Sequence, residues 1–460
     1  MEIMVIQNNK KHYSRFYSIF CAIAFIAIGL SGCGTVEDAF KRWQGKGPAP
    51  PLPGKRLSVL TNDRTLTADK TIATAKVILP APTYNKSWPQ AGGYPNHAMH
   101  HIKVRDYLQK LWSVDIGEGT SDEERLNASP VVAGQMIFAI DSQSQVSAYN
   151  TKNGRRVWKI DLTPKVDDDG HIVGGIAYEN DVIYVTTGFA EVVALRSKTG
   201  KILWRKILAA PMRSAPTVRE GRLFVITMNN ELYALNAQNG EVIWQHRGLP
   251  EIASVLGGAS PAVDKDVVIA PYTSGELIAL KVENGRVLWQ DTLTAGRRTD
   301  AISNLAGIRG HPVIDRGLVI AVSNGGIIAA IEIRTGRRIW SREIASIETP
   351  WVAGNYVFVL SNESELVAIS RESGKIKWVR GLPRFENPDD REDPIVWTGP
   401  LLTSDRLIIA GSNEDALAVS PYNGKILGVI KMPDRVNVAP IVADGKVYFL
   451  ADNAQLVAYR

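Results

Sequence analysis

Short apolar runs separated by turns recur along the chain in one frame. Seven segments place an Ala in an apolar run, a Gly six residues later and, in six of the seven, a Trp four residues after that Gly. The six Trp are Trp158, Trp204, Trp244, Trp289, Trp340 and Trp378. Runs rich in β-branched and large apolar residues are typical of strands, and Gly at the end of a turn accepts the positive φ that reverses the chain. The pattern predicts β-hairpins throughout.

The spacing of this frame sets the size of the repeated unit. A second hairpin precedes each Gly–Trp segment, as in residues 214–226, so each unit has four strands. The interval between successive Trp averages about 45 residues, the length of one four-stranded propeller blade. The last unit, residues 439–460, stops after its third strand, and residues 111–115 around Trp112 echo residues 157–161. We predict an all-β, eight-bladed propeller in which this N-terminal strand completes the last blade.

A Trp at one fixed point of each unit is expected to be structural. Trp112 brings these positions to seven, while Gly428 stands where the seventh segment would have its Trp. A large ring at a constant place fills the space between neighbouring sheets, and its truncation to Ala costs about 3–5 kcal/mol. We therefore assign these Trp to the repeat and not to a ligand site.

The first 32 residues have the features of a bacterial lipoprotein signal peptide. Three basic residues precede an uncharged apolar run over residues 16–30, which is short for a membrane span and fits a signal h-region. Residues 30–33, Leu-Ser-Gly-Cys, resemble a lipobox, which predicts cleavage before Cys33 and acylation of that Cys. An ordinary signal peptide or an uncleaved anchor is the alternative. Gly34, in place of Asp, favours sorting to the outer membrane, with the body facing the periplasm.

Four regions follow from these patterns. Residues 1–32 are the signal peptide that is removed, and residues 33–56 are the lipidated N-terminus and a Pro-rich tether. Residues 57–103 are a leading segment to which the sequence assigns no structure, and residues 104–460 form the propeller.

Composition narrows the functional classes. The formal net charge is +6, and the basic residues are spread along the chain, which does not indicate nucleic-acid binding. Cys21 and Cys33 are the only cysteines, so the chain has neither a disulfide framework nor an adjacent Cys pair. The sequence contains no P-loop, no Gly-x-Ser-x-Gly elbow and no His-Glu-x-x-His motif.

Two segments have a superficial likeness to metal sites. His97, His100 and His101 cluster in a loop-like stretch without accompanying ligands, so we interpret them as surface or packing residues. Residues 386–394 are rich in acids but lack the order of an EF-hand loop, so we interpret them as a solvated loop that is at most a binding rim. We expect no catalytic residue, metal or cofactor.

The repeats resemble the Trp-docking repeat of quinoprotein-type propellers over roughly residues 104–460. Two families use this repeat: the pyrroloquinoline-quinone alcohol dehydrogenases and the BamB family of outer-membrane assembly lipoproteins. The dehydrogenases have a vicinal Cys pair and long insertions for the quinone and Ca²⁺, which this chain lacks, whereas a lipobox on a bare propeller is the BamB pattern. The resemblance implies a non-catalytic scaffold that assists insertion of outer-membrane β-barrels. A quinoprotein-like dehydrogenase, or a propeller for another envelope partner, is the alternative.

The BamB resemblance also implies a partner, the barrel-assembly subunit BamA within the BAM complex, with this chain as a monomer of a hetero-complex. Two inter-blade loops of the family make this contact. Their matches here carry Val255 and Leu256 in the first loop, and Arg297, Arg298 and Arg309 in the second. The Arg of the family's first loop and the acids of its second are missing, so these five residues are predicted as partner-binding from position and chemistry only.

Overall fold

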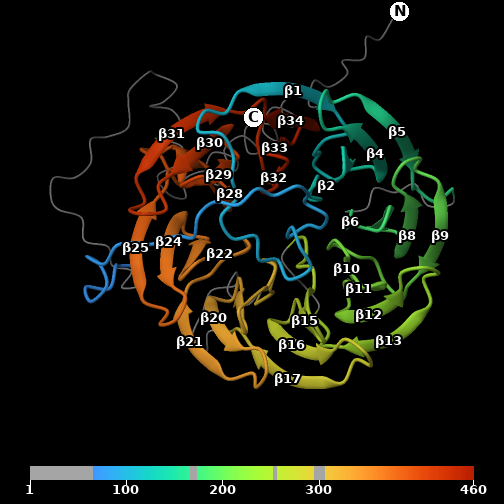
Figure 1. Ribbon diagram of the computed structural model, residues 1–460, viewed down its shortest axis with the longest axis horizontal. Coiled ribbons are helices and arrows are strands. Elements are labelled where there is room, and N and C mark those ends of the chain that lie inside the picture. Colours follow the sequence, from blue (N-terminus) through green and yellow to red (C-terminus); the bar gives the residue numbers. More distant parts are fainter. Residues whose placement is uncertain (1–65, 166–172, 252–255, 295–305) are drawn as a thin grey trace, which may run out of the picture. The chain divides into compact units, whose positions relative to one another are not determined.

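Eight four-stranded antiparallel sheets form a closed ring in which each sheet is one blade (Figure 1). The computed structural model describes residues 66–165, 173–251, 256–294 and 306–460, all of which belong to one compact unit, Leu66–Arg460. Every regular element within these ranges is a strand, and none of the described segments is a helix long and apolar enough to cross a membrane. The predicted eight-bladed, all-β propeller is confirmed.

The four strands of a blade follow one another from the ring axis outwards. The innermost strands are β2 (Val131–Ala133), β6 (Gly175–Glu179), β10 (Thr217–Arg219), β14 (Ala262–Asp264), β18 (Val313–Asp315), β22 (Trp351–Ala353), β28 (Trp397–Thr403) and β32 (Ile441–Ala443). The second strands are β3 (Met136–Ile140), β7 (Val182–Thr186), β11 (Arg222–Ile226), β15 (Val267–Pro271), β19 (Leu318–Val322), β23 (Tyr356–Leu360), β29 (Arg406–Gly411) and β33 (Lys446–Leu450). The third strands are β4 (Gln145–Asn150), β8 (Glu191–Arg196), β12 (Glu231–Asn236), β16 (Glu276–Lys281), β20 (Ile327–Glu332), β24 (Glu365–Ser370), β30 (Asp415–Val419) and β34 (Gln455–Tyr459). The outermost strands are β5 (Arg156–Asp161), β9 (Ile202–Ile207), β13 (Val242–Arg247), β17 (Val287–Thr292), β21 (Arg338–Glu343), β25 (Ile376–Gly381), β31 (Ile426–Lys431) and β1 (Lys110–Asp115).

The ring closes by pairing the two ends of the propeller. Strand β1 is antiparallel to β34, with Trp112 opposite Ala458, and so becomes the outer strand of the blade that starts at β32. Gln109 and Arg460 extend this pairing with two reciprocal backbone hydrogen bonds of 2.9 Å. The predicted closure is therefore present, and it removes an open sheet edge at the junction.

The repeated Ala, Gly and Trp have one physical explanation. In the blade of β12 and β13, Ala234 lies opposite Trp244, and the Trp244 ring covers Gly285 in the turn of the next blade. A Cβ on Gly285 would lie 2.6 Å from that ring, and its φ of +71° also favours Gly. The Trp244 Nε1–H donates to the Val282 carbonyl at 2.9 Å. The same docking joins Trp112–Gly154, Trp158–Gly200, Trp204–Gly240, Trp244–Gly285, Trp289–Gly336, Trp340–Gly374 and Trp378–Gly424.

One junction lacks this docking. Gly428 on β31 replaces the Trp, and a Cβ built there would meet no atom within 4 Å. The following blade takes its outer strand from β1, so it has no turn between third and outer strands on which a Trp could dock. The lost Trp of the seventh repeat therefore coincides with the closure of the ring.

Residues 85–102, which we call the strap, cross the middle of the ring, where Figure 1 shows them in blue. They hydrogen-bond to the innermost strand of every blade, or to the residue that follows it, in the order of the ring. The pairs are Asn85 with Val442 and Asp444, Trp88 with Val132, Pro89 with Tyr178, Gln90 with Val218, Pro95 with Val263, Asn96 with Ile314, His100 with Trp351, and Ile102 with Leu402 and Ser404. The leading segment that the sequence left without a structure is thus, from residue 66 onward, part of the compact unit.

Candidate functional site: a central pocket and its loop face

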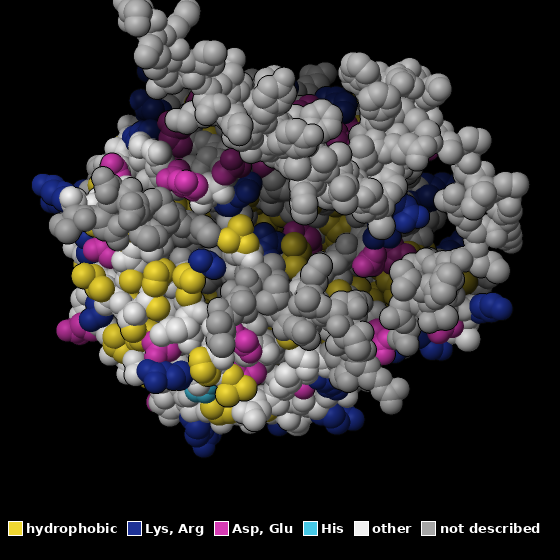
Figure 2. All heavy atoms as spheres, turned by 180° about the vertical axis from the view of Figure 1, so that it is seen from behind, with side chains coloured by type: hydrophobic (Ala, Val, Ile, Leu, Met, Phe, Trp, Pro, Cys, Tyr) yellow, Lys and Arg dark blue, Asp and Glu magenta, His cyan; other side chains and the backbone are white. Residues whose placement is uncertain are grey.

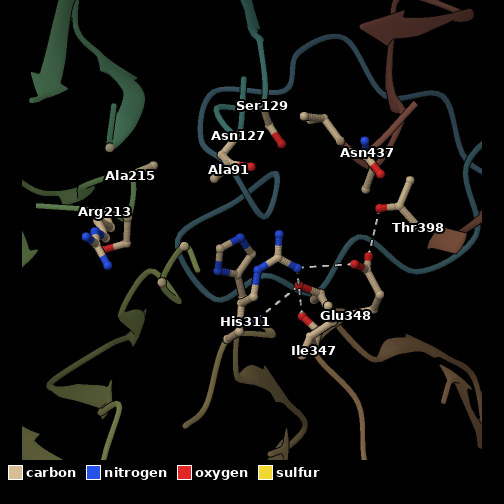
Figure 3. Close-up of a pocket in the computed structure, with 18 residues that line it drawn as sticks. Ala91, Asn127, Ser129, Arg213, Ala215, His311, Ile347, Glu348, Thr398 and Asn437 are labelled. Carbon is tan, nitrogen blue, oxygen red and sulfur yellow. Dashed lines mark hydrogen bonds and ion pairs between the residues drawn. The ribbon is translucent and has the colours of Figure 1, made fainter. Parts of the chain in front are cut away.

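A pocket of about 90 Å³ lies on the ring axis (Figure 3). Its wall is formed by the segments that enter the innermost strands, including Asn127 before β2, His311 before β18 and Asn437 before β32. Ala91 of the strap forms part of its lining as well. The strap also bonds to Ser404 and Asp444, which follow innermost strands, whereas most residues that line the pocket come from the inter-blade loops that enter those strands. The pocket therefore belongs to the face of the inter-blade loops.

A buried ion pair crosses the mouth of this pocket. Arg309 donates from Nε to the Leu256 carbonyl at 2.9 Å and from Nη1 to the Ile347 carbonyl at 3.4 Å. The same Nη1 lies 3.4 Å from Glu348 Oε1, and the two side chains are only 22% and 10% exposed. Glu348 Oε2 in turn accepts hydrogen bonds from Thr398 Oγ1 at 2.8 Å and the Gly399 amide at 3.0 Å. The network ties three inter-blade loops to β28.

Two neighbouring histidines, with their rings tilted at 42° to one another, connect the strap to the same loops. The rings of His97 and His311 lie 5.0 Å apart, His97 Nδ1 donates to the Pro312 carbonyl at 2.8 Å, and His311 Nδ1 accepts from the Ser260 amide at 2.9 Å. Burial lowers the pKa of His97 to about 4. Burial also holds the pKa of His311 well below its usual value, and the neighbouring His97 and Arg309 add to that effect. Both rings are therefore neutral at neutral pH.

The sequence of the chain matches proteins of one known family. A family model described as "Outer membrane protein assembly factor BamB" matches residues 107–170 and 142–380, more than half of the chain. The chain belongs to the BamB family. Proteins with that description from Moranella endobia and Yersinia pestis are 24% and 25% identical over 252 and 357 residues. The matches span 55% and 76% of this chain, and 63% and 88% of the two relatives.

Solved structures agree on the fold. The crystal structure of BamB from Moraxella catarrhalis has a TM-score of 0.66 and 19% identity, over 77% of this chain and 100% of that one. A quinohemoprotein alcohol dehydrogenase from Pseudomonas putida has a TM-score of 0.61 and 13% identity, over 84% and 83% of the two chains. At such identities the likeness shows the propeller fold alone, and BamB proteins and quinoproteins share it.

The partner residues expected from the BamB resemblance divide into two groups. Val255, Arg297 and Arg298 lie outside the described residues, as does Cys33. Leu256 is 41% exposed on the loop face, and a hydrogen bond from Arg309 to its carbonyl joins the two loops. The guanidinium of Arg309, however, is turned inward to Glu348, so it does not offer the free surface charge that its position in the sequence suggests.

The histidines and the acidic segment that resemble metal sites in the sequence lie among structural contacts or in an exposed hairpin. His101 is buried, with Nδ1 against the Pro80 carbonyl at 2.7 Å and Nε2 accepting from the Asp405 amide at 3.0 Å. The His100 carbonyl accepts from Trp351 Nε1. Across the described ranges, no three His, Cys, Asp or Glu side chains are grouped so as to hold a metal ion. The acidic loop after residue 385 is a short exposed hairpin of β26 (Phe385–Asn387) and β27 (Glu392–Pro394).

Sequence reasoning missed two further exposed apolar side chains on the loop face. Met228 is 37% exposed in the turn between β11 and β12, and Leu249 is 60% exposed just after β13. Asn230, in the same turn as Met228, donates from Nδ2 to the Leu249 carbonyl at 2.6 Å, so the turn and the loop are in contact. We call Met228, Leu249 and Leu256 the apolar patch. Figure 2 shows this side of the ring, with apolar side chains gathered between charged ones. The sequence does contain a sign of Met228, because this apolar residue stands in a turn that is polar in most other blades.

Proposed function

We propose that the chain is a non-catalytic scaffold lipoprotein of the outer-membrane β-barrel assembly machinery. It docks on a BamA-like subunit of the BAM complex and assists folding and insertion of outer-membrane β-barrel proteins. Membership of the BamB family supports the proposal, because relatives of that family are described as outer-membrane protein assembly factors. The proposed location is the outer membrane, through lipid on Cys33, with the propeller facing the periplasm.

The apolar patch is the observation that carries the docking proposal. A protein interface needs a few large anchors that lose water, surrounded by a polar rim. Leu249 and Leu256 are such side chains on a rigid ring, and Arg309 fixes the backbone of Leu256. An anchor that is held before binding loses little conformational freedom in the complex, which favours affinity.

The properties of the central pocket favour a scaffold over a quinoprotein enzyme. Sites for drug-sized ligands have volumes of about 300–1,000 Å³, whereas this pocket has about 90 Å³. The two cysteines are twelve positions apart in the sequence, so the vicinal pair of the resembling dehydrogenases is missing. The strap also occupies the axis of the ring. These residues do not fit a tricyclic quinone.

Co-purification tests the proposal. The lipidated protein, with a C-terminal affinity tag, is purified from detergent-solubilised envelopes, and Leu256→Asp is compared with Leu427→Asp as a matched control. Leu427 is 58% exposed on the outer strand β31, away from the loop face. We expect the BamA-like subunit with the wild type and the Leu427 variant, and much less of it with the Leu256 variant. Absence of the subunit from the wild-type preparation would contradict the proposal. A parallel incubation with quinone and Ca²⁺ should give no alcohol-dependent dye reduction.

A further inference from the structure

The central pocket contains hydrogen-bond donors that have no acceptor. Arg309 uses Nε and Nη1 in the network with Leu256, Ile347 and Glu348, and among the described residues nothing accepts from its Nη2. Asn127 Nδ2 is buried and likewise lacks an acceptor in this part of the chain. Both residues line the pocket. A buried donor without a partner is unfavourable by about 1–3 kcal/mol, so Asn127 Nδ2 indicates a missing acceptor. Arg309 Nη2, on a side chain that is 22% exposed, is a second donor that such an acceptor can use.

The charges around the pocket do not balance. Arg213 and Arg309 are cationic lining residues, and Glu348 is the one carboxylate among the residues that line the cavity. Both Glu348 oxygens are already engaged, by Arg309 on one side and by Thr398 and Gly399 on the other. Arg213 lines the pocket without an ion-pair partner within the described ranges, and burial lowers its pKa. His311 is neutral because its pKa is held well below the usual value. One positive charge therefore remains uncompensated.

The size of the pocket limits what can neutralise this charge. The volume of about 90 Å³ is small beside the roughly 300–1,000 Å³ of sites for drug-sized ligands. This is room for a carboxylate on one or two methylene groups and is too little for a nucleotide or a cofactor. Because the inter-blade loops form most of the pocket lining, such a group enters from the loop face.

We propose that the central pocket is a socket for a single carboxylate, carried by a polypeptide that docks on the loop face. The carboxylate accepts hydrogen bonds from Arg309 Nη2 and Asn127 Nδ2. In the same cavity it balances the charge of Arg213, since Arg309 is already paired with Glu348. This inference rests on the proposed docking function and adds a specificity rule to it. The docked segment needs an acidic group next to apolar side chains, because one hydrogen bond of 2.9 Å joins Arg309 to the backbone of Leu256 in the apolar patch.

Glu348 has a positioning role in this socket. It holds Nη1 of Arg309, and the Leu256 carbonyl holds Nε, so the guanidinium is fixed at two corners. A planar fork fixed in this way presents its remaining edge to the pocket with little further loss of side-chain freedom. Lys at position 309 would keep the charge but could not make both contacts.

The experiment measures fluorescence anisotropy of peptide pairs on the full mature protein. One pair is fluorescein-Gly-Leu-Leu-Glu-Leu-amide and its Gln twin, and the other is fluorescein-Gly-Leu-Leu-Leu with a free or an amidated C-terminus. We expect the acidic member of at least one pair to bind tenfold or more tightly than its twin. Preference in the first pair assigns the socket to an acidic side chain, and preference in the second assigns it to a chain terminus. Equal affinities within both pairs would overturn the socket.

Three variants separate the socket from general effects. Asn127→Leu removes a buried donor that has no acceptor among the described residues, so the preference should fall at least threefold without a loss of melting temperature. Arg309→Lys should reduce the preference as well. Arg125→Gln is the matched control, because Arg125 is an exposed cation on the loop that enters β2 and does not line the pocket. A preference that survives both pocket variants would overturn the assignment.

The outcomes also separate this inference from the proposed function. If the wild type prefers acidic peptides but never co-purifies with the BamA-like subunit, the docking proposal fails and the socket stands. If the wild type co-purifies and shows no acid preference, the socket fails and the docking proposal stands.

Discussion

The strap gives the sharpest test of how the ring is held together, through Trp88→Ala. Trp88 is 3% exposed and stacks on Trp351 with ring centroids 6.3 Å apart. Its backbone exchanges hydrogen bonds of 2.7 and 2.8 Å with Val132. The substitution keeps those backbone bonds but opens a cavity between the strap and two blades. Trp-to-Ala changes of this kind cost about 3–5 kcal/mol.

The expected change in melting temperature follows from the size of the unit. Unfolding entropy is about 2.1 cal/mol/K per residue, so the unit Leu66–Arg460 unfolds with about 0.8 kcal/mol/K. A loss of 3–5 kcal/mol then lowers the melting temperature by about 4–6 °C. Differential scanning calorimetry measures this directly. Tyr107→Ala is the control, since Tyr107 is 87% exposed between the strap and β1 and should change the melting temperature by less than about 1 °C. A Trp88 variant that melts with the wild type would refute the structural role of the strap.

Three further predictions follow from other parts of the molecule. Trp244→Ala should lower the unfolding free energy by about 3–5 kcal/mol and Ile243→Ala, at a 44% exposed site, by less than about 1 kcal/mol, as measured by urea unfolding. Burial depresses the pKa values of His97, to about 4, and of His311, while unfolded His titrates near about 6.5. The unfolded chain therefore binds more protons in acid, stability should fall as the pH drops from about 6.5 towards 4, and His97→Gln should flatten that fall in denaturation curves. Cys33→Ala should abolish acyl labelling and leave a precursor or a released body, because stable anchoring takes more than one chain; continued labelling would contradict the predicted lipid site.

The blades of this fold could be predicted from the sequence because the spacing of the repeat is strict. Ala234, Gly285 and Trp244 occupy fixed places since one ring must meet one turn of the next blade, and this constraint recurs at seven junctions. The strand around Trp112 was predictable for the same reason, because it carries the signature of a fourth strand. The loss of the Trp at Gly428 also has its explanation at the ring closure.

The strap and the pocket were not predictable from the sequence, because neither is formed by residues that recur in a periodic pattern. The strap contacts each blade through one or a few hydrogen bonds from irregular backbone, and such contacts leave no hydrophobic pattern. The pocket gathers residues from loops that are far apart in the chain, such as Asn127 and Glu348. Sequence position did bring Leu256 and Arg309 together, but it gave no sign of Glu348, which turns the Arg309 side chain inward from 39 residues away. Leu249 and Met228 were missed because a single exposed apolar residue in a loop does not form a recurring sequence pattern.

Docking on a BamA-like subunit is tested most directly by the affinity of the purified mature protein for the purified periplasmic domains of that subunit. Biolayer interferometry on the wild type, Leu256→Asp and Leu427→Asp gives three dissociation constants under one set of conditions. A true anchor contributes about 2 kcal/mol or more, so the Leu256 variant should bind about 30-fold more weakly, and the Leu427 variant should match the wild type. Undiminished binding by a folded Leu256 variant would place the docking surface elsewhere on the ring, and no measurable binding by the wild type would contradict the account.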